Sequence, residues 1–246
     1  VDPMVGTRGS GNAVPGALVP HGMVKLSPDT LSPGACEGYE YDDPKIEGFA
    51  HTHLEGPGGS NYGYGEISLL PQVGELEFHS SKAAAHYSHT SELARPGYYR
   101  VDLDESGIVV ALTAPAHAGF HRYTFPSCDG NRVLIDAGHT RGKSLDGEVE
   151  VVDAHTVEGY GVSQVYPLIA FGLGNSAPNT GVSKAYFSVR FNRRFERFGT
   201  WSDDGAVDGQ RQVSGPRSGA YLELGHRAWQ AVEAQVGISF IDTAHA

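Results

Sequence analysis

The sequence has very little cysteine, with only Cys36 and Cys128 in 246 residues. A fold held together by disulfide bonds needs more cysteines than this. A zinc site built on thiolates would also need more of them, at closer spacing. One disulfide bond and two free buried thiols both remain possible, so cysteine usage does not indicate a redox compartment.

Long apolar runs and positive charge are also scarce. Runs such as VYPLIAFGLG are far too short to span a bilayer. The 18 Lys and Arg residues face 29 Asp and Glu residues, which gives a net charge of −11. Such a chain repels nucleic acid and anionic membranes, so we expect neither as a partner. The charge does not exclude binding of a neutral sugar.

What the sequence has in abundance is short β-like segments. Hydrophobic residues make up 39% of the chain, which is typical of a globular protein, and no amphipathic helix exceeds three turns. The segments with alternating or β-branched residues are 23–26, 46–54, 66–70, 75–79, 98–103, 108–112, 119–125, 132–135, 148–152, 156–165, 168–172, 185–198, 221–224 and 231–240. Turn signals separate many of them, for example at 104–107, 129–131, 146–147 and 203–205.

This pattern predicts an all-β fold, a large antiparallel β-sandwich of two sheets (a supersandwich). No linker or internal repeat divides the chain, so residues 1–246 are expected to form a single domain. Loops are expected at 141–147, 174–184 and 201–219. The first residue is Val1 rather than Met, which suggests either a trimmed signal peptide or a sequence cut at an artificial start. The last strand, AVEAQVGISFID, has no stop signal, which favours a cut after a domain boundary over a natural end.

The first seventy residues combine glycine with polar and aromatic side chains. Arg8, Ser10 and Asn12 lie in a glycine-rich loop and offer donors to hydroxyl or phosphate oxygens. No strand and helix flank this loop, so a nucleotide site is not indicated, and a plain cluster of turns is the alternative. Further along, the same mixture includes His21 and Tyr39, as expected of a binding loop that approaches its ligand closely.

His51 and His53 are two residues apart in a β-like stretch. On a strand both side chains share one face, so both imidazoles could reach one point. They could bind a sugar, ligate zinc as part of a metal-dependent enzyme, or serve only as hydrogen-bonding structural residues. No third zinc ligand at a suitable spacing is evident.

Two further patterns carry weaker chemical signals. Five acids lie close together, and they could act as a catalytic carboxylate pair, as oxygen ligands for calcium, or simply as solvated charges: Glu37, Glu40, Asp42, Asp43 and Glu47. The run FNRRFERF at 191–198 is expected to be a strand with one aromatic and one basic face. Trp201 follows it, as a platform for a sugar ring or as a buried anchor.

Five blocks of sequence, in order, resemble glycoside hydrolase family 92, the calcium-dependent exo-α-mannosidases. The blocks are VDPMVGTRGSGNAVPGALVPHGMVKLSPDT, GYEYDDPKIEGFAHTHLEGPG, SHTSELARPGYYRVDL, LTAPAHAGFHRYTFP and VGISFID. The resemblance covers essentially the whole chain. It implies that residues 1–246 are the N-terminal β-sandwich domain of a longer enzyme. A C-terminal (α/α)6 barrel absent from this chain would carry the acid, the base and most calcium ligands.

The resemblance also implies a function for the longer protein. That protein would hydrolyse terminal α-linked mannosides, such as those of N-glycans, with inversion and with calcium as cofactor. Its partners would be a mannose-containing glycan and its own catalytic domain, and it would be secreted or periplasmic. No catalytic residue is then expected here, and the residues implied to line the substrate pocket are Arg8, Ser10, Asn12, His21, Cys36, Glu37, Tyr39, His51 and His53. An autonomous carbohydrate-binding module without catalysis is the alternative.

Three positions depart from the family pattern. His21 stands where the family usually has Phe, and Pro33-Gly-Ala-Cys36 stands where a Trp-Asp-Gly-Cys run is usual. The loop at 58–65 is longer than usual. A histidine near Arg8 and Ser10 would suit an anionic leaving group, so cleavage of a mannosyl phosphodiester is a further hypothesis.

Overall fold

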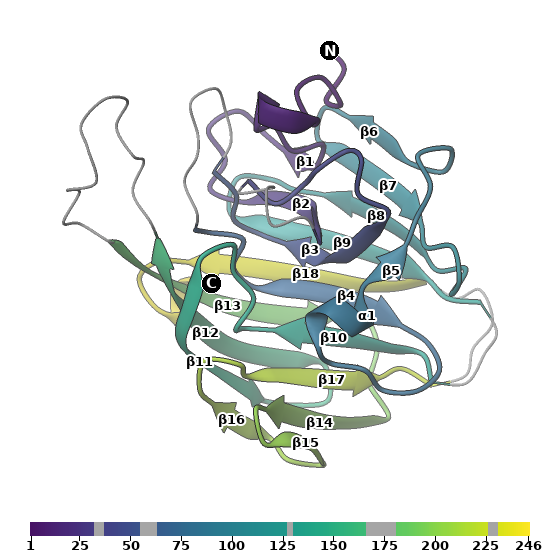
Figure 1. Cartoon of the computed structure of the whole chain (residues 1–246). Coiled ribbons are helices and arrows are strands. Elements are labelled where there is room, and N and C mark those ends of the chain that lie inside the picture. The colour runs from purple at the N-terminus through teal and green to yellow at the C-terminus, as the bar shows by residue number, and fades with distance from the viewer. Residues whose placement is uncertain (32–36, 55–62, 127–129, 166–180, 226–230) are drawn as a thin grey trace.

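The structure is a computed structural model that describes residues 1–31, 37–54, 63–126, 130–165, 181–225 and 231–246. In these ranges the regular structure is almost entirely β, with one short α-helix, α1, at Ser80–Ala83 and two short 3-10 helices, η1 at Gly9–Gly11 and η2 at Thr243–His245. The strands form two antiparallel sheets that pack as layers (Figure 1). The prediction of an all-β, two-sheet sandwich is therefore confirmed.

The first sheet contains most of the N-terminal strands. Its strand order is β1-β2-β3-β4-β10-β17-β14-β15, and β5 pairs with β3. The bounds are β1 Ala17–Leu18, β2 Lys25–Thr30, β3 Lys45–Ala50, β4 Ser68–Gln72, β5 Ala85–His86, β10 Arg132–Asp136, β14 Arg197–Ser202, β15 Gly205–Asp208 and β17 Gly219–Glu223.

The second sheet has the strand order β16-β11-β12-β13-β18-β9-β8-β7-β6. The bounds are β6 Leu93–Arg95, β7 Tyr98–Asp102, β8 Val109–Thr113, β9 Ala118–Thr124, β11 Lys143–Val151, β12 Thr156–Val165, β13 Gly181–Phe191, β16 Gln212–Ser214 and β18 Ala231–Ser239. Strand β18, the last of the chain, lies in the middle of this sheet between β13 and β9.

The two sheets are covered to different extents. In the second sheet buried and partly exposed residues alternate, as along β12, so one face packs on the core and the other meets solvent. In the first sheet β4, β10 and β17 are buried along nearly their whole length, so both faces are covered. Phe78, from the segment around α1, stacks on Trp201 of β14 on the outer face.

Several local predictions are wrong, for identifiable reasons. The turn signal at Asp146 and Gly147 lies inside β11, where the pairing with β12 shifts register between Ser144 and Asp146. The chain there makes a β-bulge rather than a loop. The predicted loop at 201–219 contains β15 and β16, and residues 75–79 form no strand.

The run FNRRFERF is not one strand either. It ends β13, crosses a turn and begins β14. Phe191 and Phe195 are buried and make an edge-to-face contact, while Arg194 and Arg197 are exposed. The aromatic residues thus close the end of the core. Trp201 is 4% exposed, which fits a buried anchor.

Candidate functional site

Asp29 of β2 is a buried carboxylate that binds two histidines from distant parts of the chain. One of its oxygens, Oδ1, accepts a hydrogen bond from His53 Nε2 at 2.8 Å, and Oδ2 accepts one from His139 Nε2 at 2.6 Å. The side chain of Asp29 has no exposure to solvent. The register between β2 and β3 shifts directly after Asp29, and bulges of this kind redirect side chains. We call Asp29, His53 and His139 the Asp29 cluster.

The charges of the Asp29 cluster support one another. Burial alone would raise the pKa of Asp29, but His53 and His139 hold that pKa well below its usual value. Burial likewise opposes protonation of His139, yet the hydrogen bond and charge of Asp29 raise the pKa of His139. Both ring nitrogens of His53 face acceptors, because Nδ1 lies 2.7 Å from the carbonyl oxygen of Lys25. An imidazolium satisfies both contacts.

His51 and His53 do not share a target. His51 Nδ1 donates to the Ile67 carbonyl oxygen at 2.6 Å, and His51 Nε2 lies 2.9 Å from Nε2 of His121 on the opposite sheet. Nδ1 of His121 in turn accepts from the Tyr123 hydroxyl at 2.7 Å. Neutral tautomers satisfy this entire chain of donors and acceptors. Burial lowers the pKa of His51 to about 4, and it also lowers the pKa of His121.

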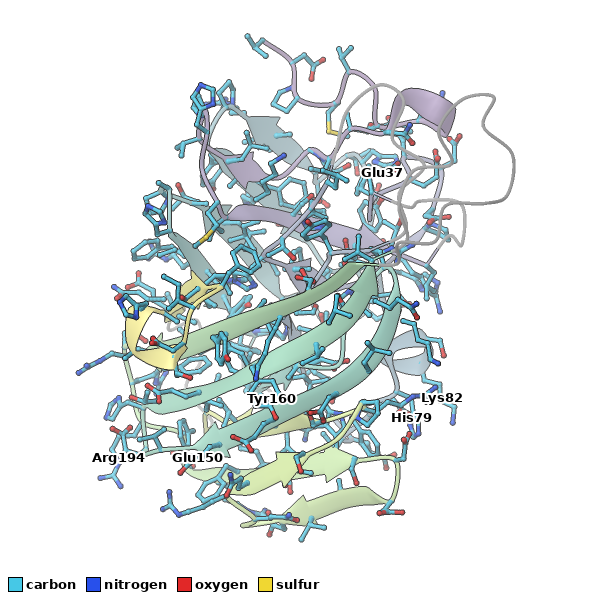
Figure 2. All side chains as sticks on the ribbon, turned by 90° about the vertical axis from the view of Figure 1, so that its left-hand side faces the viewer. Glu37, His79, Lys82, Glu150, Tyr160 and Arg194 are labelled. Carbon is cyan, nitrogen blue, oxygen red and sulfur yellow. The ribbon has the colours of Figure 1, made fainter. Side chains whose placement is uncertain are left out.

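The segment at 37–42 packs directly against the Asp29 cluster. Gly38 has a φ of +118°, and a Cβ atom there would lie 2.1 Å from Oδ1 of Asp29. The Gly38 carbonyl oxygen accepts from Thr30 N at 2.7 Å. Glu37 is 4% exposed, and Figure 2 shows it with the N-terminal segments, far from His79 and Lys82. The position of the segment at 37–42 therefore depends on the position of Asp29.

Tyr39 fixes the same segment from the other side. Its ring is fully buried, and its hydroxyl donates to Glu92 Oε1 at 2.9 Å. Tyr99 donates to the same oxygen at 2.7 Å. Burial and the Glu92 carboxylate raise the pKa of Tyr39 far above its usual value. Tyr39 is thus a neutral hydrogen-bond donor held inside the protein.

The glycine-rich loop is tied to this segment by charge. The Arg8 guanidinium lies 2.6 Å from Oδ1 of Asp42 and stacks over the Tyr41 ring, 4.7 Å from its centre. The backbone N of Gly9 donates to Glu40 at 3.0 Å. Asn12 has a left-handed backbone, with a φ of +52°. The Ser10 side chain and Cys36 lie outside the described residues.

His21 occupies a different place. It is exposed, has a φ of +61°, and sits in a turn whose neighbour Met23 bonds to Ala116 between β8 and β9. In the described part of the chain, no hydrogen bond or ring contact joins His21 to Arg8. Of the predicted site residues that the structure describes, Arg8, Glu37, Tyr39 and His53 thus belong to segments joined around Asp29, whereas His51 turns into the core and His21 lies apart.

A polar cavity of about 520 Å³ opens beside His139. Glu47, Asp136 and Trp201 also line it, and burial raises the pKa of both carboxyl groups. Arg141 lies 3.3 Å from Glu47 Oε2 and donates to the Thr30 carbonyl oxygen. The cavity thus lies against the Asp29 cluster.

Sequence reasoning missed Asp29, His139, Arg141 and Glu66. Glu66 is 1% exposed and accepts hydrogen bonds from Thr52 and from Ser163 of β12, so it links the two sheets. A signal for Asp29 existed, since a carboxylate in an otherwise buried strand requires partners. Its partners could not be found, because His139 lies 110 residues away in sequence.

Known proteins resemble this chain over its full extent. The model of the glycosyl hydrolase family 92 N-terminal domain matches residues 1–239. A protein of Arthroderma benhamiae, described as an uncharacterized secreted glycosidase, is 29% identical over 98% of this chain and 33% of its own length. The chain thus spans about a third of that relative.

Solved structures give the same result. A family GH92 α-mannosidase from Bacteroides thetaiotaomicron has a TM-score of 0.85 and 26% identity, over 99% of this chain and 33% of its own. The structure of that enzyme in complex with mannoimidazole also has a TM-score of 0.85, with 25% identity, over 99% of this chain and 32% of its own. The chain therefore belongs to glycosyl hydrolase family 92 and corresponds to the N-terminal domain of that family.

Proposed function

We propose that this chain is the N-terminal part of a longer, inverting exo-α-mannosidase that removes terminal α-linked mannose from glycans such as N-glycans. The match of residues 1–239 to the family's N-terminal domain carries this proposal. The similar Bacteroides enzyme, which is called an α-mannosidase and was solved with mannoimidazole, supports mannose as the sugar. The loops joined by the Asp29 cluster would form one wall of the sugar pocket.

In this proposal the described residues position the pocket wall rather than perform the chemistry. His51, Tyr39 and the side chain of His53 are buried and bonded to protein partners, so they hold the loops in place. Arg8 and Asn12 lie nearer the surface and are the candidates for direct contact with the sugar. A barrel in the rest of the protein would supply the acid and the base.

We propose that the described residues do not form a calcium site by themselves. The acids near the glycine-rich loop are already engaged with separate partners: Glu40 with Gly9, Asp42 with Arg8 and Glu47 with Arg141. No group of three or more His, Cys, Asp or Glu residues suited to a metal occurs in the described ranges. We propose that most of the calcium ligands lie in the rest of the protein.

The decisive experiment compares the 246-residue chain with the complete gene product. We expect the complete protein to hydrolyse an α-mannobiose with inversion, followed by NMR of the released anomer, and to lose activity on chelation of calcium. The 246-residue chain alone should be inactive. Hydrolysis by the short chain, or no hydrolysis of any α-mannoside by the complete protein, would refute the proposal.

His21 provides a test of the leaving group. His21 lies apart from Arg8, but its imidazole is exposed, and we propose that it contacts an anionic leaving group, so that the enzyme also cleaves mannosyl phosphodiesters. His21→Phe in the complete protein should lower the kcat/KM for a mannosyl phosphodiester about tenfold, because one charge-assisted hydrogen bond is lost. The kcat/KM for a plain mannoside should stay the same. An unchanged ratio of the two values would exclude this role.

We also propose that the protein is secreted or periplasmic. The Arthroderma relative is described as secreted, which supports this location. None of the described helices is long and apolar enough to cross a membrane. Fractionation of the native host, with the protein detected by an antibody, would test it, and recovery in the cytoplasm would contradict it.

A further inference from the structure

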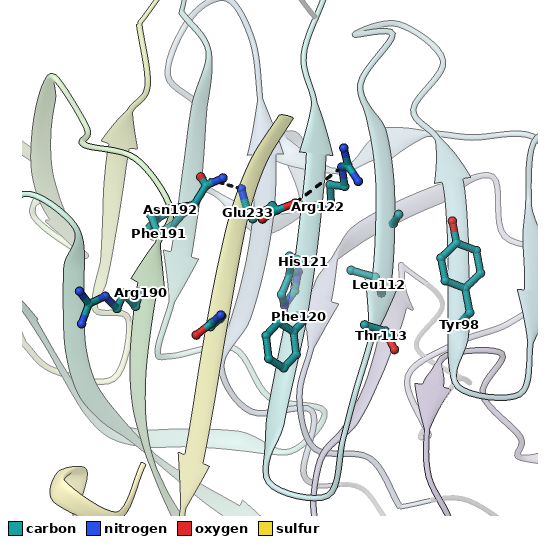
Figure 3. Close-up of a pocket in the computed structure, with 12 residues that line it drawn as sticks. Tyr98, Leu112, Thr113, Phe120, His121, Arg122, Arg190, Phe191, Asn192 and Glu233 are labelled. Carbon is teal, nitrogen blue, oxygen red and sulfur yellow. Dashed lines mark hydrogen bonds and ion pairs between the residues drawn. The ribbon is translucent and has the colours of Figure 1, made fainter. Parts of the chain in front are cut away.

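The outward face of the second sheet carries a groove of about 420 Å³, and no residue of the Asp29 cluster lines it (Figure 3). Its base is made by five neighbouring strands, β7, β8, β9, β18 and β13. Because alternate residues of a strand point to one face, outward side chains line up across the strands. The aligned row, read from the pairing register, is Tyr98, Thr113, Phe120, Gln235 and Arg190. A volume of this size is typical of small-ligand sites.

Two aromatic rings are available in this row. Tyr98 and Phe120 are both partly exposed and lie on either side of Thr113. Two strand spacings separate them, roughly 10 Å. Among the described residues neither ring has an aromatic or cationic partner. Tyr160 and Tyr186, on the same face outside the groove, instead contact each other beneath the Lys184 ammonium.

The polar groups of the groove include two guanidinium donors, Arg122 and Arg190, beside amides and hydroxyls that both donate and accept. Glu233 is the one carboxylate among the described lining residues, and it lies 3.9 Å from Arg122. The side chains of Gln235 and Arg190 have no protein partner in the described part of the chain. Such a lining offers little to a metal ion, and its outward side chains include no large aliphatic anchor. Donors beside flat apolar rings suit a ligand rich in hydroxyl oxygens.

We propose that this groove binds a neutral oligosaccharide. Tyr98 and Phe120 stack against the apolar faces of sugar rings, and Gln235 and Arg190 donate hydrogen bonds to hydroxyl oxygens. The site lies on the outer side of the strand whose His121 reaches inward to His51. It would hold a glycan on the sheet face, independently of any bond cleavage. The choice of an α-mannosyl probe rests on the proposed function. The proposal that the groove binds a sugar rests only on the side chains that line it.

The test is a calorimetric titration of the 246-residue chain with two neutral trisaccharides, one α-linked mannose and one β-linked glucose. We expect saturable binding of at least one of them. Phe120→Ala should raise its Kd about tenfold, because one stacking contact is lost. Tyr186→Ala is the matched control, since Tyr186 is a partly exposed ring on the same sheet outside the groove, and it should leave the Kd unchanged.

Circular dichroism and urea unfolding of each variant establish that it is folded. A second variant, Gln235→Ala, weakens binding without removing a ring. Absence of binding at about 10 mM of either sugar, or equal weakening by Phe120→Ala and Tyr186→Ala, overturns the proposal. Sedimentation provides a further test. If the chain self-associates and Phe120→Ala dissociates it, a second copy occupies the groove and the proposal is wrong. Mannoside hydrolysis by the complete protein is measured separately, so failure of the groove leaves that result intact.

Discussion

At Gly38 the candidate site has no room for a side chain. Its positive φ is unfavourable for any other L-residue, and an added Cβ would collide with the carboxylate that joins His53 and His139. Backbone strain and loss of those hydrogen bonds then add together. The proximity of a small residue to a buried ion pair is what allows the segment at 37–42 to pack here.

We therefore expect Gly38→Ala to lower the free energy of unfolding by about 2 kcal/mol, measured by urea denaturation. The histidine ring signals of the Asp29 cluster should shift in NMR. Gly74→Ala is the matched control, since Gly74 has a φ of +80° and open space around its Cβ position. Equal destabilisation by the two substitutions would show that backbone strain alone is responsible.

The hydrogen bond from Tyr39 to Glu92 also holds the segment at 37–42 in place. Tyr39→Phe removes a hydroxyl that donates to a buried carboxylate, so unfolding should become easier by about 2 kcal/mol. Differential scanning calorimetry would show the lower Tm. The comparison is Tyr186→Phe, whose ring is partly exposed. No difference between the two would mean that water replaces the lost donor at Glu92.

At the scale of elements, the segment around α1 covers part of the outer face of the first sheet. Phe78 stacks on Trp201, with ring centres 5.8 Å apart. Phe78→Ala should lower the free energy of unfolding by about 2 kcal/mol, less than for a fully buried ring because Phe78 is only half-buried. Val207→Ala on exposed β15 should have almost no effect. Chemical denaturation followed by Trp fluorescence would separate the two.

Periodicity identified elements well where burial alternates. The predicted strand 156–165 coincides with β12, and 108–112 nearly coincides with β8. The prediction failed where long-range pairing overrides local signals. Asp146 and Gly147 resemble a turn, but pairing with β12 keeps them in a bulged strand. FNRRFERF is predicted to be one strand, yet its phenylalanines stand at 191, 195 and 198, without a period of two, and they close the core across a turn.

The candidate site could be predicted only in part. Arg8, Tyr39, His51 and His53 belong to segments that the structure does bring to one region. Their partners Asp29, Glu92 and His121 are distant in sequence, and no local pattern pairs residues that far apart. Which way His51 points depends on the opposite sheet, so the shared-face argument could not decide it.

At the scale of the whole molecule, buried titratable groups make stability depend on pH. The folded state holds His51 neutral, with its pKa lowered from 6.5 to about 4. The unfolded chain therefore binds more protons between these values, and stability falls as pH decreases from 6.5 to 4. The lowered pKa of Asp29 adds a second loss below pH 3.8, and the raised pKa of His139 adds stability that is lost above pH 6.5.

We expect the free energy of unfolding to fall by about 3 kcal/mol between pH 6.5 and 4 from His51 alone. Urea titrations at several pH values would measure this slope. The double variant His51→Gln with His121→Gln should flatten it, whereas His79→Gln, at an exposed position, should not. If the unmodified protein, the double variant and His79→Gln all show the same slope, the pH dependence of stability comes from other groups.

The edges of the two sheets have a consequence for self-association. In the described ranges the outermost strands are short: β1 has two residues, β15 four, β6 three and β16 three. Such edges present few free backbone groups to an approaching chain, a common protection against fibril-like growth. Phe120 and Tyr98 lie on a sheet face instead, where contact is made by side chains alone.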